Sequence, residues 1–524
     1  MTKFETEISK RRTFAIISHP DAGKTTITEK ILYNCGAINV VGEVRGKAGT
    51  KAATSDWMKM EQERGVSITS SVMQFDYEGL RFNLLDTPGH KDFGEDTYRT
   101  LIAADCATML IDAAKGVEAQ TRKLYEVCRM RKMPIFTFAN KMDREGKNPL
   151  ELIDDVENTL QMACYPIMWP IGMGGLFRGL YHRLSKKIYL YEKGKVEPKI
   201  VSVTDYDDKK IEKLVGTELF ETFVEELTLL QGITGEFDQN LFLSGKLSPM
   251  TFGSAKNNWG VDLFLSLFTK YSPPPQPRET LTHIVLPADE HFSGFVFKIQ
   301  ANMDRRHRDR VSFIRVCSGQ FERGMKVTNL RSQKELRLSY ANQFLAQERE
   351  TVDLAYAGDI IGINDSGNLQ IGDTLSTGKI SPFQDIPRFS PEHFGRVLVK
   401  DALKRKQLEK GLQQLVDEGA IQFFYDPLVG KQDPVLGVVG LLQFDVLLYR
   451  LKDEYGLAVQ FERLPYQLAR WPKDTLGKAV TGSINGNVKI YHDVQENPVL
   501  LFNEEWDLRW LQKQNPDIEF RITS

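Results

Sequence analysis

Short apolar runs in the first half of the chain alternate with stretches whose apolar positions recur at helical intervals. The runs at 14–17, 82–85, 108–111 and 135–138 have the length of buried strands. Between the last two runs, residues 120–131 carry a helical pattern. Strands separated by helices favour a mostly parallel sheet with crossover connections, so the pattern predicts an α/β domain over residues 1–277.

The pattern changes after a proline-rich run at 273–277. Because proline has a fixed φ and no backbone N–H, this run predicts a stiff linker. Beyond it, strand candidates at 295–299 and 311–316 are followed by frequent glycines. Such spacing is typical of a small antiparallel barrel, which we expect over residues 278–388.

Residues 389–524 mix helices and strands again. In chain order the patterns indicate strand 396–400, helix 402–418, strand 420–425, strand 435–439, helix 441–455 and strand 458–462. The order β-α-β-β-α-β is that of a ferredoxin-like α+β unit. We expect a hairpin at 487–502 and a closing helix at 504–515 to follow it.

Composition and charge narrow the class of protein. Hydrophobic residues make up 41% of the chain and aromatic residues 10%, which is enough for packed interiors. The 68 Lys and Arg residues are balanced by 70 Asp and Glu residues, so the chain lacks the basic surplus of a general RNA-coating protein. The charged N-terminus lacks a signal-peptide pattern, and no apolar run reaches the roughly 18 residues of a membrane span. With five scattered cysteines, these features predict a cytoplasmic protein without membrane contact.

The segment after the first predicted strand has the sequence of a phosphate-binding loop. It leads into a helical stretch, so its backbone N–H groups would face phosphates at a helix N-terminus. Lys24 would supply a positive charge to the β- and γ-phosphates, and the Thr25 hydroxyl would bind Mg²⁺. Ser18 stands where the motif usually has its first glycine. The expected phosphate-binding residues are Ser18, His19, Pro20, Asp21, Ala22, Gly23, Lys24, Thr25 and Thr26.

A second motif closes the strand predicted at 82–85. Ligands bind at the carboxyl ends of strands in open α/β sheets, so Asp86 is placed to hold Mg²⁺ through a water molecule. Gly89 has no side chain, which lets its N–H approach the γ-phosphate. The same residues also make a good turn, but their position after Lys24 and Thr25 favours a nucleotide site. The expected contacts are Asp86, Thr87, Pro88, Gly89 and His90.

Two further loops predict that the base is guanine. The Asp143 carboxylate can accept both the N1 proton and the exocyclic amine of guanine, whereas adenine offers neither donor there. Sites that hydrogen-bond a polar group reject analogues lacking it by about 10⁴-fold or more. Asn140 can serve the N7 side of the ring, the Lys141 stem can lie over the base, and the Ala255 N–H can reach the guanine oxygen. The expected base-contacting residues are Asn140, Lys141, Met142, Asp143, Ser254, Ala255 and Lys256.

The spacing between these two loops is wide for a minimal domain of this kind. Residues from about 173 to 248 are therefore expected to be an insertion. The expected fold class is a multidomain chain with an α/β P-loop G domain, an all-β barrel and an α+β ferredoxin-like domain.

The segments 19–26, 64–69 and 86–90 together resemble the translational GTPase superfamily. In that family the histidine after the second motif, here His90, orients the attacking water. The resemblance implies that His90 is catalytic, and a structural histidine is the alternative. Residues 64–69 resemble switch I, whose hydroxyl binds Mg²⁺ and senses the γ-phosphate; Ser67 stands where the family usually has threonine, and Thr69 is the rival. The implied ligands are GTP or GDP and Mg²⁺, with Thr25, Ser67 and (through water) Asp86 at the metal.

The resemblance extends, in segments 295–311 and 437–446, to the release-factor branch of the superfamily. Elongation factor G, a close relative, carries two further carboxyl-terminal domains for which this chain is too short. The resemblance implies a ribosome-stimulated GTPase that acts as a monomer and removes class I release factors from the ribosome after peptide release. An arginine-rich segment at 305–310 could touch ribosomal phosphates or be a solvated loop. The alternatives are a shortened translocase and a nucleotide-gated adaptor with negligible hydrolysis.

Overall fold

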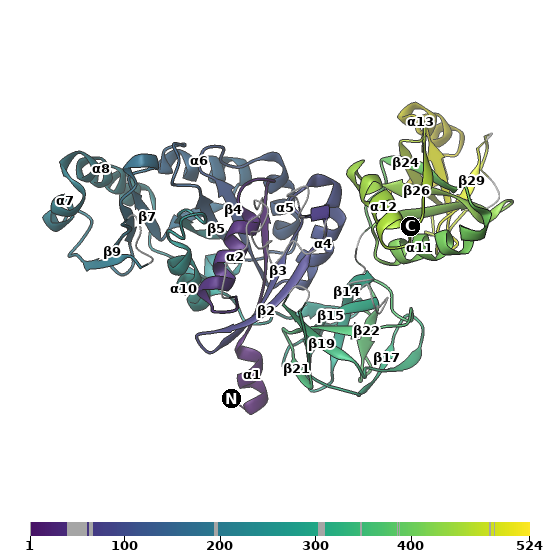
Figure 1. The fold of residues 1–524 in the computed structure, drawn as a ribbon, viewed down its shortest axis with the longest axis horizontal. Coiled ribbons are helices and arrows are strands. Elements are labelled where there is room, and N and C mark those ends of the chain that lie inside the picture. Colours follow the sequence, from purple (N-terminus) through teal and green to yellow (C-terminus); the bar gives the residue numbers. More distant parts are fainter. Residues whose placement is uncertain are drawn as a thin grey trace.

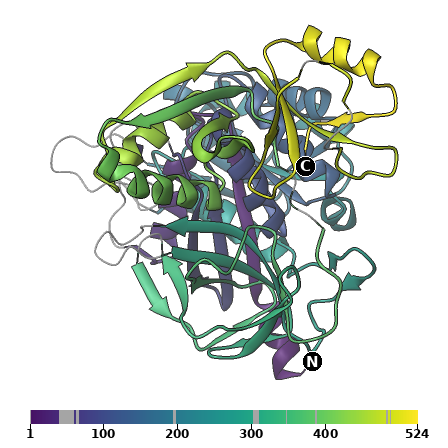
Figure 2. The same cartoon turned by 90° about the vertical axis from the view of Figure 1, so that its right-hand side faces the viewer.

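The chain folds into three parts in a computed structural model (Figure 1). We call them the N-terminal part (residues up to 272), the barrel (278–383) and the C-terminal part (393 onward). The structure describes residues 2–38, 60–61, 67–192, 197–301, 310–345, 348–384, 386, 388–480, 484–486 and 488–523. Figure 2 shows the C-terminal part above the barrel, with the N-terminal part behind both.

The N-terminal part is built on a sheet of order β2-β3-β1-β4-β5-β11-β6, in which the strands from β3 to β6 are parallel. These strands are β1 (Arg11–Ser18), β2 (Ser71–Tyr77), β3 (Leu80–Asp86), β4 (Cys106–Asp112), β5 (Ile135–Asn140), β6 (Ala163–Pro166) and β11 (Leu247–Phe252). The helices around the sheet are α1 (Lys3–Ser9), α2 (Lys24–Asn34), α4 (Gly94–Ala103), α5 (Ala119–Met130), α6 (Pro149–Leu160) and α10 (Val261–Tyr271), with the 3₁₀ turn η1 at Lys91–Phe93. The predicted parallel sheet is confirmed. Strand β2, which pairs antiparallel with β3, was not predicted.

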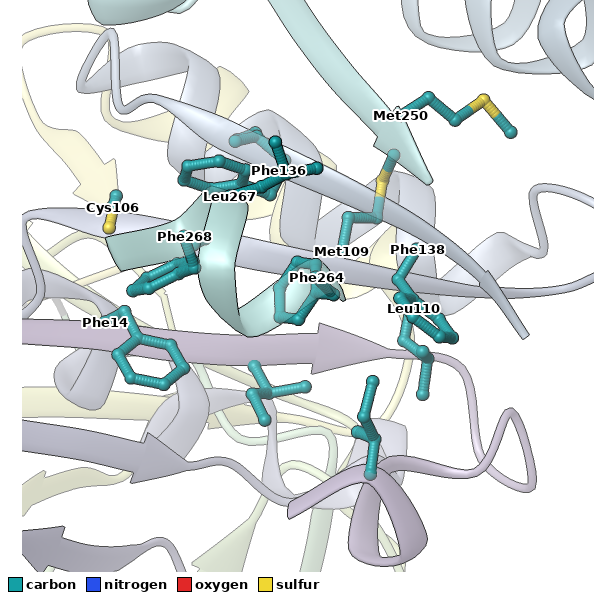
Figure 3. Close-up of a cluster of buried hydrophobic side chains, with 14 of the residues drawn as sticks. Phe14, Cys106, Met109, Leu110, Phe136, Phe138, Met250, Phe264, Leu267 and Phe268 are labelled. Carbon is teal, nitrogen blue, oxygen red and sulfur yellow. The ribbon is translucent and has the colours of Figure 1, made fainter. Parts of the chain in front are cut away.

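Aromatic side chains lock α10 onto this sheet (Figure 3). The ring of Phe268 lies 4.4 Å from that of Phe14 and 4.8 Å from that of Phe136, measured between centroids. Phe264 packs edge-on against Phe138 at 5.5 Å. All five side chains are almost fully buried, so the strands that carry the predicted loops share one rigid core.

The segment predicted as an insertion forms a lobe at the far end of the N-terminal part (Figure 1). A four-stranded sheet of order β10-β9-β8-β7 packs there with three helices. Its elements are β7 (Met168–Ile171), η2 (Gly174–Leu176), β8 (Gly179–His182), β9 (Lys187–Leu190), β10 (Lys199–Ser202), α7 (Lys209–Val215), α8 (Thr217–Ile233) and α9 (Gln239–Leu243). The lobe's sheet thus begins at Met168, a few residues before the predicted start of the insertion.

The barrel consists of antiparallel strands around an apolar interior that includes Val296, Ile314, Val316, Phe321 and Ile361. Its strands are β12 (Arg278–Glu279), β13 (Ile284–Val285), β14 (Ser293–Ala301), β15 (Arg310–Ser318), β16 (Gln320–Glu322), β17 (Lys326–Asn329), β18 (Lys334–Arg337), β19 (Ala341–Leu345), β20 (Glu348–Thr351), β21 (Leu354–Tyr356), β22 (Ile360–Asn364) and β23 (Thr374–Ser376). Strand β19 also pairs with β2, where Leu345 faces Met73 along the backbone. The barrel and the N-terminal part therefore share one continuous sheet.

Buried polar groups tie the barrel to the N-terminal part. The carboxylate of Asp105 accepts from Arg278 at 3.1 Å and from Arg315 at 2.5 Å. The carbonyl of Gly358 accepts hydrogen bonds from Arg315, from Thr13 and, at 3.1 Å, from Asn83. Because these groups are buried, each depends on its partner across the boundary for the hydrogen bonds that water would otherwise supply.

The first six regular elements of the C-terminal part have the predicted order. They are β24 (His393–Val399), α11 (Arg405–Asp417, after the turn η3 at Ala402–Lys404), β25 (Gln422–Asp426), β26 (Gly430–Val438), α12 (Leu442–Asp453) and β27 (Val459–Leu464). The strand order β27-β24-β26-β25 is antiparallel and ferredoxin-like. The predicted fold class is confirmed.

The same sheet continues beyond the ferredoxin-like unit. The predicted hairpin is β29 (Ile490–His492) with β30 (Pro498–Phe502), and the predicted closing helix is α13 (Glu505–Gln514). Strands β28 (Leu468–Lys473) and β31 (Glu519–Arg521) join them and were not predicted. Within the described residues, none of the helices combines the length and apolar character needed to cross a membrane.

Candidate nucleotide site

A cavity of about 280 Å³ lies where several strands of the N-terminal part end. Strands β1, β3 and β5 all stop at this edge, at Ser18, Asp86 and Asn140. The lining residues are Ser18, His19, Pro20, Asp21, Gly23, Lys24, Thr25, Thr26, Ser67, Gly89, His90, Asn140, Lys141, Asp143, Arg144 and Lys256. The structure thus brings residues from every predicted loop to one cavity.

The first loop ends at the N-terminus of α2. Gly23 is the residue before the helix and has a φ of 101°, which a residue with a side chain rarely adopts. A Cβ atom there would also overlap the side-chain amide of Asn140. The first backbone N–H groups of α2 lie at the cavity, and so does the positive end of the helix dipole. Both features favour the binding of a phosphate group.

Lys24 connects this loop to the second motif. Its Nζ atom donates to Asp86 Oδ1 at 2.6 Å and lies 3.4 Å from Ser67 Oγ. All three side chains are buried, and Thr25 lies beside them on the first turn of α2. A buried ammonium group, a carboxylate and hydroxyls are therefore gathered at one end of the cavity.

The two candidate hydroxyls of switch I have different surroundings. Ser67 lines the nucleotide cavity, whereas Thr69 lines a separate cavity between the three parts of the chain. The Thr69 backbone N–H donates to Glu61 Oε1 at 3.0 Å. Residues 62–66 lie outside the described residues, as do residues 305–309 of the arginine-rich segment.

Asn140 holds the base-side loops together. Its Nδ2 donates to the Ala22 carbonyl at 2.8 Å, and its Oδ1 accepts from the Ala255 N–H at 2.8 Å. Ser254 Oγ donates to Asp143 Oδ1 at 2.6 Å. The Ala255 N–H, predicted to reach the guanine oxygen, donates to Asn140, which is the last residue of β5.

Several predicted contact residues do not line the cavity; they are Ala22, Asp86, Thr87, Pro88, Met142, Ser254 and Ala255. They lie behind the wall and support it. Thr87 Oγ1 donates to the Ile16 carbonyl at 2.6 Å, and the buried Met142 donates its N–H to the Gly253 carbonyl. The sequence motifs are contiguous, but side chains along a strand end or tight turn point in different directions, so only part of each motif reaches the cavity.

Some residues around the cavity were not predicted from the sequence motifs. Lys141 Nζ pairs with Asp112 Oδ2 at 2.8 Å, which restrains the lysine beside the site. Glu118 Oε1 lies 3.4 Å from His19 Nε2, and Arg144 lines the cavity directly. Asp112 is the last residue of β4, so the strand-end rule that selected Asp86 could have found it.

His90 lies on the rim of the cavity. Its side chain is about one-third exposed, and its Nδ1 accepts a hydrogen bond from the Asp92 backbone N–H at 3.2 Å. It lines the same cavity as Lys24 and Ser67.

Comparisons with known families divide the chain into three matches. The Elongation factor Tu GTP binding domain matches residues 9–274, and Elongation factor G domain 2 matches residues 291–378. The family described as Class II release factor RF3, C-terminal domain, matches residues 383–512.

Curated relatives match along the full length. A Peptide chain release factor 3 from Symbiobacterium thermophilum is 50% identical over 100% of this chain and 99% of its own. Another, from Gloeobacter violaceus, is 50% identical over 98% of this chain and 97% of its own. The chain belongs to the peptide chain release factor 3 family. It is a GTPase of translation termination, as the release-factor resemblance of its sequence implied.

A solved structure supports the fold of this release factor 3 family member. A crystal structure of a protein from Thermus thermophilus has a TM-score of 0.70 and covers 93% of this chain and 72% of its own. The two sequences are 23% identical, so the likeness concerns the fold alone.

Proposed function

We propose that the chain binds GTP with Mg²⁺ in the 280 Å³ cavity and hydrolyses it on the ribosome. In this proposal the GTP-bound state removes class I release factors after the peptide has been freed. The observation that carries the proposal is that Lys24, which is hydrogen-bonded to Asp86, and Ser67 line one cavity together with residues of the loop after β5.

Guanine selection would rest on Asp143. Its carboxylate is oriented by Ser254 at 2.6 Å and borders the cavity. A fixed carboxylate accepts the two N–H donors on one edge of guanine, and an adenine there would leave the carboxylate unpaired. Asn140 would contribute by holding the P-loop against this base-side loop.

The phosphate end fits Mg²⁺. Its candidate donors are all oxygens, namely the hydroxyls of Thr25 and Ser67 and, through water, the carboxylate of Asp86, and Mg²⁺ prefers oxygen ligands. When bound, the ion would neutralise charge on the β- and γ-phosphates. Lys24 would exchange its contact with Asp86 for the phosphates, and the N–H groups of α2 would hold them in place.

His90 would orient the attacking water. Its Nδ1 lies 3.2 Å from the Asp92 backbone nitrogen and 3.3 Å from Asp92 Oδ1, so the turn at Asp92 holds this side of the ring. The other ring nitrogen, Nε2, can hydrogen-bond a water molecule, which is the contact that an orienting role requires.

We further propose that the protein is a cytoplasmic monomer whose hydrolysis is slow without ribosomes. The test compares wild type with His90→Ala, and with His283→Ala as a control at an exposed histidine of the barrel. GTP hydrolysis is measured with and without ribosomes, together with the release of a labelled class I factor from post-termination ribosomes. We expect ribosomes to stimulate wild type and His283→Ala strongly, and His90→Ala weakly.

Each result of this test has a clear meaning. Equal hydrolysis with and without ribosomes would contradict ribosome-dependent activation. Equal hydrolysis by wild type and His90→Ala would contradict the role of His90. Hydrolysis without faster release of the labelled factor would contradict the proposed partner and favour a translocase-like activity.

A further inference from the structure

Asp92 lies between His90 and the C-terminal part of the chain. Its backbone N–H donates to His90 Nδ1 at 3.2 Å, and its Oδ1 atom is 3.3 Å from the same nitrogen. Its other carboxylate oxygen, Oδ2, accepts from the Leu442 N–H at 2.9 Å, across 350 residues of sequence. The Asp92 side chain is only 8% exposed, so this is a buried contact.

The contact caps a helix of the C-terminal part from outside. Leu442 is the first residue of α12, and the residue before the helix, Leu441, has a side chain without any hydrogen-bonding atom. The Asp92 carboxylate accepts from the N–H of the first helical residue, one of the N–H groups that have no partner within the helix. Its negative charge also lies at the positive end of the α12 dipole.

Gly440 makes the close approach possible. A Cβ atom on Gly440 would overlap the Cβ, Cγ and Oδ1 atoms of Asp92. The φ of Gly440 is not positive, so alanine could adopt the same backbone conformation. The effect of a side chain at this position would therefore be to fill the space that Asp92 occupies. Gln443 accepts the neighbouring N–H groups of Val439 and Gly440, which leaves the Leu442 N–H for Asp92.

Apolar contacts join the same surfaces. Phe93, the residue after Asp92, packs with Val446 of α12 and with Ile68, the residue after Ser67. Figure 1 shows α12 on the side of the C-terminal part that faces α4, the helix that follows this turn. The segments that carry both His90 and Ser67 therefore contact one helix of the C-terminal part.

We propose that Asp92 is a positioning residue through which the docking of α12 sets the orientation of His90. The inference rests on the proposed orienting role of His90. While α12 is docked, the Leu442 N–H fixes the Asp92 carboxylate, and the turn around Asp92 fixes the imidazole. A shift of α12 withdraws this support, so the position of the C-terminal part controls hydrolysis without a change in any cavity residue.

The test uses Gly440→Ala, a change in the C-terminal part that leaves the nucleotide cavity intact. Gly232→Ala is the matched control, because a Cβ atom at Gly232 meets nothing within 4 Å. Asp92→Ala and Asp92→Asn complete the set, since Asn keeps an oxygen that can accept from Leu442. For each variant we measure kcat and KM of GTP hydrolysis at saturating ribosomes, and the affinity for a fluorescent GTP analogue.

We expect Gly440→Ala and Asp92→Ala to lower kcat by about tenfold or more, because small displacements of a catalytic group are costly. Affinity for the analogue should stay within about twofold, since the residues that grip the nucleotide are untouched. Asp92→Asn should recover part of the kcat lost in Asp92→Ala, and Gly232→Ala should match wild type. A general loss of folding would instead lower affinity and kcat together and would not be rescued by Asn.

The inference is overturned if His90→Ala loses activity while Gly440→Ala and Asp92→Ala keep the wild-type kcat. That result would leave the proposed role of His90 intact and remove only the role of Asp92. Full activity of His90→Ala would overturn the proposed function itself. If Gly440→Ala does not fold, the two Asp92 variants decide. Wild-type kcat in both Asp92→Asn and Asp92→Ala would then overturn the positioning role. Equally low kcat in both variants, accompanied by weaker nucleotide binding, would also overturn it.

Discussion

The ammonium group of Lys24 lies 2.6 Å from Oδ1 of Asp86, with the two side chains 7% and 2% exposed. These residues stand 62 positions apart: Lys24 is the first residue of α2, and Asp86 is the last residue of β3. Ser67 Oγ completes the group at 3.4 Å from Lys24. The proposed phosphate end of the site is thus assembled from segments that are far apart in the sequence.

The surroundings of Ser67 and Thr69 lead to a prediction about Mg²⁺. We expect Ser67→Ala to raise the Mg²⁺ concentration needed for half-maximal hydrolysis and to lower activity by about tenfold or more, because a hydroxyl in the nucleotide cavity is lost. Thr69→Ala should change both values much less, since Thr69 lines a different cavity. The measurement is GTP hydrolysis on ribosomes across a Mg²⁺ titration. A larger effect of Thr69→Ala would assign the switch I ligand to Thr69.

The Asp143 carboxylate predicts a change in base specificity. In Asp143→Asn an amide N–H₂ group would face the N–H donors of guanine, so GTP affinity should fall by about 10²-fold or more. Xanthine carries a carbonyl in place of the exocyclic amine, and this oxygen can accept from the new amide. Xanthosine triphosphate should therefore bind the variant better than it binds wild type, as measured by competition with a fluorescent nucleotide. Equal losses for both nucleotides would indicate damage to the loop instead.

The sequence predicted those features that depend on neighbouring residues. Strands β1, β3, β4 and β5 followed from apolar runs, and the loops after them followed from motif chemistry. Strand β2 was missed although Met73, Phe75 and Tyr77 alternate with Gln74 and Asp76, because Val72 breaks the alternation at the start of the strand and weakens the periodic signal.

Contacts between segments that are far apart in the chain could not be predicted from the sequence. The Asp92–Leu442 hydrogen bond and the pairing of Met73 with Leu345 join segments hundreds of residues apart. Neither partner carries a local pattern that indicates the other, since such contacts depend on how complete parts dock.

The Asp105 cluster predicts a large loss of stability on removal of its charge. Asp105→Asn would leave Arg278 and Arg315 buried without their counter-ion, which typically costs about 3 to 5 kcal/mol. The exposed pair of Asp353 and Arg323, at 2.9 Å, provides the control. Asp353→Asn should cost less than about 1 kcal/mol. Urea unfolding of the full chain, followed by far-UV circular dichroism, compares the midpoints, and similar midpoints for both variants would contradict the prediction.

Burial lowers the pKa of His182 to about 4, below its ordinary value of 6.5. Its Nδ1 accepts from the Ser185 N–H at 3.2 Å, which suits the neutral ring. Between pH 6.5 and 4 the unfolded chain therefore binds a proton that the folded chain does not, so stability falls as pH falls through this window and is unaffected above it. At pH 5 the loss from this group is roughly 1 to 2 kcal/mol.

His182→Gln removes this titration. The change in thermal midpoint between pH 7.5 and pH 5 should be smaller for His182→Gln than for wild type, because the other acidic and basic groups are common to both. His283→Ala, at an exposed position of the barrel, should behave as wild type. An equal change in all three proteins would contradict a depressed pKa for His182.

The shared sheet and the Gly358 carbonyl have a consequence for dissecting the chain. A recombinant fragment that stops at the proline-rich linker would lack Arg278, Arg315 and Gly358, and with them the hydrogen bonds that these residues make to Asp105, Thr13 and Asn83. It would also expose the edge of β2 that pairs with β19, and an exposed strand edge can pair with a strand of a second copy. The smallest soluble GTP-binding fragment should therefore extend through β23, with the barrel included as a structural requirement of the nucleotide-binding part itself.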